Sequence, residues 1–292
     1  MASTTEYDKV GLMDSQAVAR FYDRTQRWFT WAYSDRQSLG LHYGFWDTTT
    51  RNRAEALTNQ YRAVSTLLEP QPGEHILDAG CGVGGAALWL SAHGPGHYVG
   101  ITLSSVQRGL AQRYARQRHL EDQVEFYQMD YRRTAFPNAA FDKVFGIESF
   151  CYAYPDLRPL LTEMHRLLTP GGRIVMSDGI LRRRPTDAVE RQLVGDCAGG
   201  YFLSGWNTAD EVQAVFRNAG FHELEFIDQT QAIAKSVLDV DRRRRLAGLV
   251  LRFLHRLGLA SDEEQLLLQA TSAQRSAYEL GLIGYGIFTG RK

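Results

Sequence analysis

The feature that most constrains the fold of this chain is the segment HILDAGCGVGG at residues 75–85. An apolar run from His75 to Asp78 leads directly into closely spaced glycines, and the helical run AALWLSAH follows them. Glycine has no Cβ and adopts positive φ readily, so it suits a sharp turn at which the backbone approaches a ligand. With a further strand expected at residues 97–103, the pattern predicts a βαβ unit that binds a ligand at the turn.

The alternation of strands and helices continues beyond this unit. We predict helices at residues 104–119, 156–168 and 208–219 and strands at residues 124–130, 141–149, 173–178 and 221–228, with a last apolar strand, IGYGIFTG, near the C-terminus. Such alternation indicates a sheet covered on both faces, with ligands at the carboxyl ends of its strands. The predicted fold is α/β: a Rossmann-like, doubly wound, mostly parallel seven-stranded sheet.

Other segments fall outside this alternation. Residues 1–68 are expected to form N-terminal helices and an aromatic stretch, LHYGFWD, residues 69–230 the cofactor-binding core, and residues 231–292 a helical lid insert followed by the terminal strand of the core. The irregular stretch 181–206 and the insert both follow strands, so we expect both on the ligand side, as a lid over an acceptor. The N-terminal helices lie outside the sheet and offer a surface for pairing into a homo-oligomer.

Composition narrows the classes of partner. Lysine plus arginine and aspartate plus glutamate number 33 each, so no net positive charge would attract nucleic acid. No stretch approaches the ~20 apolar residues that a membrane-spanning helix needs, and the start does not read as a secretory leader, so we expect a cytoplasmic protein without stable membrane insertion. Three widely spaced cysteines and the lack of a DxD or DDxxD motif predict free thiols and no metal.

The glycine turn alone leaves two cofactor classes open. Gly80, Gly82 and Gly85 also satisfy GxGxxG, the pattern of nicotinamide dinucleotide sites. Those sites usually carry an acidic residue about 20 residues further on, and none stands there in this sequence. Instead, Gln107 lies one helical turn into the next helix, where it can reach ribose hydroxyls. Asp130, at the end of the third strand, is placed either to accept from an adenine amino group or only to cap a turn.

Five segments resemble the successive motifs of class I S-adenosylmethionine-dependent methyltransferases: ILDAGCGVGG, GITLSSVQ, Met129-Asp130-Tyr131, FDKVFGIESFCY and EMHRLLTPGGRIVMSD. Within that class, the form GITLSxxQ is similar to the branch that contains γ-tocopherol, sterol and isoprenyl diphosphate C-methyltransferases and cyclopropane fatty acid synthases. LHYGFWD resembles the aromatic lid segment of that branch. The resemblance implies S-adenosylmethionine as the cofactor.

The resemblance also implies cofactor contacts, position by position. Asp78, Gly80 and Gly82 would hold the aminoacyl end and Tyr43 would close over the methionine portion, whereas Thr102, Leu103 and Gln107 would hold the ribose, Asp130 with Tyr131 the adenine, and Cys81 and Ile147 would also line the site.

Three residues are candidates for catalysis. Glu148 follows an apolar strand, where a charge is costly unless it is paired or useful, so it could remove a proton from the acceptor, stabilise a carbocation, or only orient the cofactor. Tyr152 stands where several relatives carry a histidine, which weakens a histidine-base mechanism here. It could line an apolar pocket, face a cation or simply pack in the core. His42 is a second acid–base candidate, with a structural role as the alternative.

Two arginine clusters raise the question of a phosphorylated acceptor. Arg182 to Arg184 and Arg242 to Arg245 could bind a diphosphate, or could be solvated helix ends. Our leading hypothesis is methyl transfer from S-adenosylmethionine to a carbon or oxygen of a lipophilic small molecule, such as a terpenoid, polyketide or other specialised metabolite. The alternatives are methyl transfer to a phosphorylated isoprenoid, an NAD-dependent oxidoreductase, an idle binding protein, or a non-methylating cyclase on the same scaffold.

Overall fold

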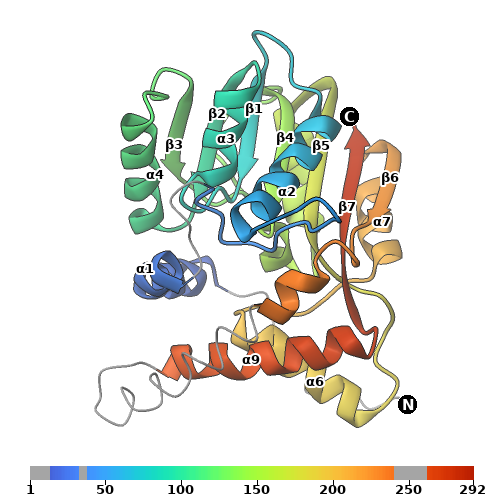
Figure 1. Cartoon of the computed structure of the whole chain (residues 1–292). Coiled ribbons are helices and arrows are strands. Elements are labelled where there is room, and N and C mark those ends of the chain that lie inside the picture. Colours follow the sequence, from blue (N-terminus) through green and yellow to red (C-terminus); the bar gives the residue numbers. More distant parts are fainter. Residues whose placement is uncertain (1–13, 33–37, 240–261) are drawn as a thin grey trace.

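The computed structural model describes residues 14–32, 38–239 and 262–292 of the chain. Its centre is a seven-stranded sheet (Figure 1). In spatial order the strands are β3 (Val124–Gln128), β2 (His97–Thr102), β1 (His75–Ala79), β4 (Phe141–Ile147), β5 (Leu168–Leu181), β7 (Ile283–Arg291) and β6 (His222–Asp228). Strands β1 to β5 pair in parallel, and only β7 runs antiparallel to its neighbours β5 and β6. The predicted mostly parallel sheet is confirmed.

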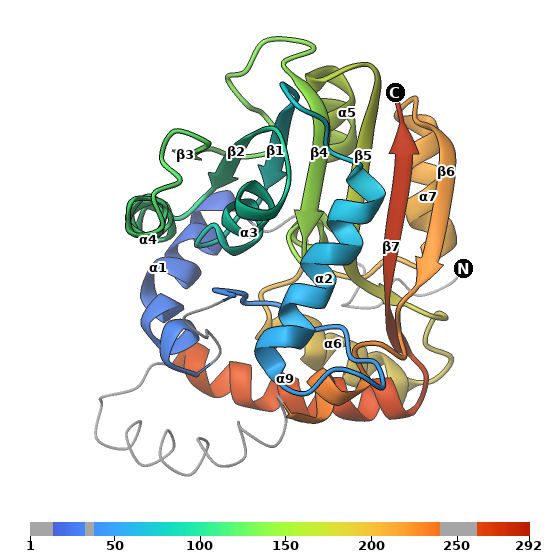
Figure 2. The same cartoon turned by 45° about the horizontal axis from the view of Figure 1, so that its top comes forward.

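Helices cover both faces of the sheet (Figure 2). One face carries α2 (Arg53–Leu68), α3 (Gly85–His93) and α4 (Ser105–Gln117), and the other carries α5 (Arg158–Leu167) and α7 (Ala209–Asn218). The central strands are therefore apolar on both sides. Ile76 and Leu77 on β1 and Val144 and Phe145 on β4 have no exposed surface, which is typical of a parallel sheet between two helical layers.

Polar caps explain where several of these helices begin. The Asn52 side chain accepts from the backbone N–H of Glu55 at the start of α2, and the Ser104 side chain does the same for Gln107 at the start of α4. At the start of α7, Thr208 and Glu211 form a reciprocal capping box. The helices predicted at residues 104–119, 156–168 and 208–219 agree with α4, α5 and α7 to within a few residues at each end.

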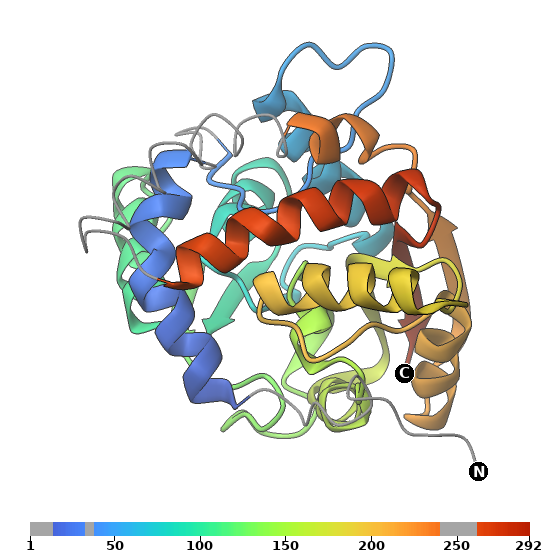
Figure 3. The same ribbon diagram turned by 90° about the horizontal axis from the view of Figure 1, so that it is seen from below.

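Three further helices cross the carboxyl ends of the parallel strands (Figure 3): α1 (Ser15–Ala32), α6 (Ala188–Gly200) and α9 (Asp262–Glu279). The prediction of an irregular stretch at residues 181–206 is wrong in part, because α6 lies within these residues. Three glycines weaken the intrinsic helix propensity of α6, but packing along α9 supports the helix. No helix in the described part of the chain is long and apolar enough to cross a membrane.

Candidate functional site

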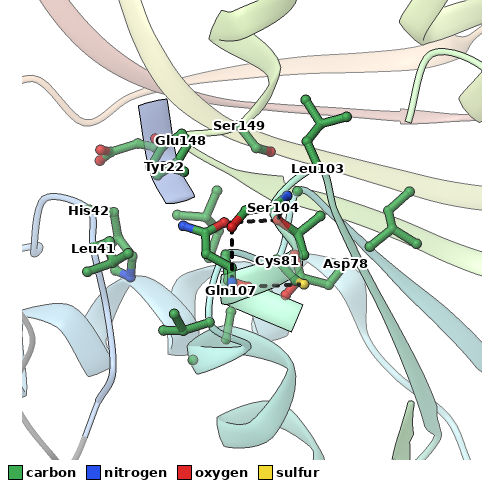
Figure 4. A pocket seen from close by; sticks show the side chains of 18 of the residues that line it. Tyr22, Leu41, His42, Asp78, Cys81, Leu103, Ser104, Gln107, Glu148 and Ser149 are labelled. Carbon is green, nitrogen blue, oxygen red and sulfur yellow. Dashed lines mark hydrogen bonds between the residues drawn. The ribbon is translucent and has the colours of Figure 1, made fainter. Parts of the chain in front are cut away.

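A cavity lies at the carboxyl ends of β1, β2 and β4, and we call it the first cavity. Figure 4 shows its walls, with the segment that carries Leu41 and His42 facing the strand ends. Most of the predicted cofactor residues line it, namely Asp78, Gly80, Cys81, Gly82, Thr102, Leu103, Gln107, Tyr131 and Ile147.

The glycine turn brings bare backbone to the wall of the first cavity. Gly80 has φ +95°, and a Cβ built on it would lie 2.4 Å from Cβ of Ser149, so only glycine fits there. Gly82 has φ +54°, and a Cβ on it would meet no atom within 4 Å. The turn is held in place because the N–H groups of Gly80 and Cys81 both donate to the Ile101 carbonyl, each at 2.9 Å.

Asp78, near the end of β1, lines the first cavity, as does the carboxyl group of Glu148. Asp78 is 2% exposed, and its Oδ2 has no hydrogen-bond partner among the described residues. Burial raises the pKa of Asp78 to about 8, because no nearby cation offsets the loss of water. A ligand ammonium group placed here would satisfy the orphaned oxygen and restore the charge. The residues therefore fit the amino group of S-adenosylmethionine.

Gln107 is fixed by two elements at once. Its Oε1 accepts from Thr102 Oγ1 at 2.9 Å, and its Nε2 donates to Gln26 Oε1 of α1 at 2.9 Å. The Ser104 hydroxyl also joins α1, through Asp23. Helix α1 is thus tied to the β2–α4 turn and supplies Val18 and Tyr22 to the wall of the first cavity.

Asp130 lies outside the residues that line the first cavity. Its carboxylate pairs with Arg132, at 2.9 Å between Oδ2 and Nη2, and accepts from the Ser15 hydroxyl, so these contacts hold its pKa below the usual value although partial burial opposes them. Its neighbours Met129 and Tyr131 do line the cavity. A contact between Asp130 and adenine stays a prediction, and it would require the carboxylate to leave Arg132.

A second cavity adjoins the first. The two share the wall residues Tyr22, Leu41, His42, Glu148 and Tyr152. The aromatic side chains of the second cavity are Phe21, Tyr22, Tyr43, Tyr152, Tyr201, Trp206 and Tyr285, and its charged residues are Arg53, Glu148 and Asp178. All three predicted catalytic residues therefore lie at the junction of the two cavities.

Glu148 directly follows β4 and has φ +47°, a left-handed conformation that is unusual for glutamate and is often found at functional sites. Its Oε1 accepts from the backbone N–H of Tyr43 at 2.8 Å. Enclosure by protein atoms raises the pKa of Glu148 to about 8, and the nearby Asp178 carboxylate adds to the rise. The hydrogen bond from Tyr43 opposes the rise without cancelling it.

Asp178 on β5 is a functional candidate that the sequence argument missed. Ile147 pairs with Ser177 across β4 and β5, so Glu148 and Asp178 occupy neighbouring positions on adjacent strands. The Asp178 carboxylate accepts from the N–H groups of Cys151 and Gly179, each at 3.0 Å, and burial raises its pKa to about 6. The strand-end signal that singled out Glu148 is also present in VMSD, the run that ends at Asp178.

The remaining predicted residues divide between the cavities. The Tyr152 hydroxyl is 2.6 Å from the hydroxyl of Tyr22, a residue of α1 that carries no sequence motif. His42 borders both cavities, with its Nδ1 2.7 Å from the Tyr43 carbonyl oxygen. Tyr43, expected over the methionine portion of the cofactor, lines the second cavity and not the first.

The arginines that suggested a phosphate site are paired with carboxylates where the structure describes them. Nη2 of Arg183 lies 2.6 Å from Oε1 of Glu190, and Nη2 of Arg184 lies 2.5 Å from Oε1 of Glu211. Nη2 of Arg182 lies 3.9 Å from Oδ2 of Asp228. None of the three lines either cavity. The cluster Arg242 to Arg245 lies outside the described residues.

Known proteins match this chain over its full length or its core. Residues 76–172 match the family model described as a methyltransferase domain. The chain is 27% identical over 280 residues to Methyltransferase GfsG of Streptomyces halstedii, covering 95% of each chain. It is 28% identical over 253 residues to 27-O-demethylrifamycin SV methyltransferase of Amycolatopsis mediterranei (86% and 89% covered). It is 30% identical over 180 residues to 24-methylenesterol C-methyltransferase 2 of Oryza sativa subsp. japonica (61% and 49% covered).

The sheet order and the glycine turn are those of the Rossmann-like fold of class I methyltransferases. With the matches to named methyltransferases, the conclusion is that this chain is an S-adenosylmethionine-dependent methyltransferase. The predicted class, its cofactor and its likeness to the branch with sterol C-methyltransferases are confirmed. The nicotinamide-dependent alternative is not favoured, nor is transfer to a phosphorylated isoprenoid.

Proposed function

We propose that the chain methylates an oxygen or carbon of a lipophilic small molecule, a terpenoid, polyketide or similar specialised metabolite. The observation that carries the proposal is the position of Glu148 at the junction of the two cavities. A cofactor in the first cavity and an acceptor in the second would meet beside its carboxyl group. The names of two relatives, a rifamycin methyltransferase and a sterol C-methyltransferase, support a large and mostly apolar acceptor.

We assign the cofactor to the first cavity. S-adenosylmethionine supplies an electrophilic methyl group when it is bound. Asp78 would hold its amino group, the backbone of Gly80 to Gly82 would accept the close approach of its aminoacyl end, and Gln107 would reach its ribose. These contacts would fix the direction of the methyl group toward the second cavity, which is the main contribution of an enzyme to an in-line displacement.

We assign Glu148 a role in the reaction of the acceptor. For a hydroxyl acceptor, the ionised carboxylate takes the proton as the new oxygen–carbon bond forms and the bond between the methyl carbon and the sulfonium sulfur breaks. A pKa of about 8 leaves the minor fraction of Glu148 ionised at neutral pH, so this reaction should become faster as the pH rises. For an alkene acceptor, the same carboxylate stabilises the positive charge that develops on the acceptor. The aromatic walls exclude water from both reactions. We assign α6 and α9 to the lid over this cavity, because Tyr201, directly after α6, and Gln274 of α9 line it.

The proposal is tested with the purified full chain and methyl-labelled S-adenosylmethionine. The protein is first titrated with S-adenosylhomocysteine, and then incubated with lipophilic acceptors that include 27-O-demethylrifamycin SV and a sterol alkene. We expect labelled product and S-adenosylhomocysteine in equal amounts. Conversion of an acceptor without consumption of the cofactor would instead indicate a cyclase, and a folded protein that binds no S-adenosylhomocysteine would overturn the cofactor site.

Three organisational expectations remain proposals beside this one. The division at residues 1–68, 69–230 and 231–292 is a working description of the chain, and limited proteolysis would test its boundaries. Pairing of subunits through the N-terminal helices would appear as a dimer in sedimentation. A cytoplasmic location would be tested by fractionation of the source cells.

A further inference from the structure

The second cavity is polar at two separate places. The carboxyl groups of Glu148, directly after β4, and Asp178, on β5, stand at the carboxyl edge of the sheet. The other polar place is formed by Tyr201, directly after α6, and by Gln274 of α9, and these two helices cross below that edge (Figures 1 and 3). There the Tyr201 hydroxyl donates to Oε1 of Gln274 at 2.7 Å. The two places come from elements far apart in the sequence, and both border the second cavity.

Gln274 has unused hydrogen-bonding capacity. It is 5% exposed, and the bond from Tyr201 occupies its carbonyl oxygen. Its amino group donates to no residue in the described part of the chain, so two N–H donors remain for a ligand. Trp206, another wall residue, has a buried indole N–H that likewise has no partner among the described residues. The helix side of the cavity therefore offers donors, whereas the sheet side offers carboxyl groups.

Apolar side chains line the cavity as well. They are Phe21 of α1, Leu41 and Leu203, together with the rings of Tyr22 and Tyr152. A ligand that uses both polar places and these apolar side chains has two oxygen groups on a hydrocarbon frame.

We propose that the acceptor carries, besides the group that is methylated beside Glu148, a carbonyl or ether oxygen at its far end, and that Gln274 determines specificity by donating to this oxygen. The inference rests on the proposed function, since it places the acceptor in the second cavity. An acceptor without the far oxygen leaves a buried amino group unpaired, and sites built to hydrogen-bond a ligand discriminate strongly against analogues that lack the partner group.

The inference is tested with two probes of one shape, androsterone, which has a hydroxyl at one end and a ketone at the other, and its analogue without the ketone. The full chain, saturated with S-adenosylhomocysteine, is titrated calorimetrically with each steroid. We expect androsterone to bind the wild-type protein at least about tenfold more tightly, the effect of one hydrogen bond. Gln274→Leu removes the donors and should make the two affinities equal.

Controls and contrary outcomes separate this inference from the proposed function. Gln192→Leu, at an exposed glutamine of α6, should retain the preference for the ketone. Gln274→Glu, which keeps the shape, should also lose it, and an unchanged S-adenosylhomocysteine affinity shows that each variant is folded. Equal wild-type affinities, or a preference that survives both Gln274 variants, overturn the role of Gln274 and leave the lipophilic acceptor standing. If neither steroid binds a protein that binds S-adenosylhomocysteine, the inference falls, and the proposed function is decided separately by the methyl-transfer assay with the acceptors named above.

Discussion

The two cavities of this methyltransferase adjoin each other but are built by different means. The first cavity is formed chiefly by strand ends and the turns that follow them, and bare backbone at Gly80 and Gly82 forms part of its wall. The second is formed in large part by side chains, many of them aromatic, from α1, the segment at residues 41–43, the region after α6, and α9. Backbone geometry therefore shapes the site of the constant ligand, and side chains shape the site of the variable one.

The carboxyl groups of the two sites also differ in their surroundings. Asp78 borders the first cavity alone, and its Oδ2 has no partner among the described residues. Glu148, which borders both cavities, and Asp178 of the second lie close enough for their charges to interact. A buried carboxyl without a protein partner suits binding of a ligand cation. Two neighbouring carboxyls suit proton transfer, because each alters the proton affinity of the other. Substitutions of Asp78 should therefore change mainly cofactor affinity, and substitutions of Glu148 and Asp178 should change mainly the rate of methyl transfer and its pH dependence.

The largest effect should come from Glu148→Gln. Loss of the proton acceptor should lower kcat by about 10²- to 10⁴-fold, the usual contribution of a general base. The amide can still accept from the Tyr43 N–H, so the local fold should persist. Steady-state kinetics with the acceptor found by screening measures kcat, and titration with S-adenosylhomocysteine shows whether the cofactor site is intact. A large loss of cofactor affinity would make Glu148 a cofactor ligand instead.

The next effect should come from Asp78→Asn. A hydrogen bond to a charged group contributes enough that S-adenosylhomocysteine affinity should fall about 10- to 100-fold. The free carboxyl, with a pKa of about 8, is mostly protonated at neutral pH. Pairing with the ligand ammonium lowers that pKa, so wild-type binding should release a proton and strengthen as pH rises toward 8. Calorimetry in buffers of different ionisation enthalpy detects the proton, and proton release that persists in the variant would contradict the assignment.

A smaller effect is expected for Asp178→Asn, in the pH dependence. Glu148 must be ionised to accept a proton, so wild-type kcat/KM should rise with pH through about 8. The Asp178 charge raises the pKa of Glu148, and its removal should lower that pKa and move the rise to more acidic pH. The groups facing Glu148, besides Asp178, include Tyr285 on β7, Arg53 on α2 and Tyr22 on α1. An unmoved pH profile would show that the two carboxyls do not couple.

The smallest effect is expected for Arg184→Ala. The guanidinium pairs with Glu211 at an exposed position and lines neither cavity. Exposed ion pairs contribute little, so the free energy of unfolding should change by less than about 1 kcal/mol. Denaturant unfolding measures the free energy of unfolding, and steady-state kinetics should show an unchanged kcat/KM. A marked loss of activity would instead support an acceptor that carries an anionic group.

Most residues that line the first cavity can be located from the sequence because the signals that point to them are local, although Asp130 and Tyr43 lie outside its lining. The apolar strand followed by closely spaced glycines locates Asp78 and Gly82, and the helical spacing after the next strand locates Gln107. These segments are short, and their geometry depends little on the rest of the chain. The second cavity depends on contacts between distant segments. Tyr22 meets Tyr152 across 130 positions, and Tyr201 meets Gln274 across 73, and no local pattern announces either pair. Helix α6 was missed for the same reason, since its glycines hide a helix that α9 supports.

The wall that Tyr201, directly after α6, and Gln274 of α9 contribute has an evolutionary consequence. Both residues border the second cavity, and neither borders the first. Mutations there can redirect a duplicated gene toward a new metabolite while its dependence on S-adenosylmethionine is inherited unchanged. Tyr22 of α1 and Tyr152 have no such freedom, because they border both cavities. Lineages of this enzyme should therefore diverge faster around Tyr201 and Gln274 than at the two shared tyrosines.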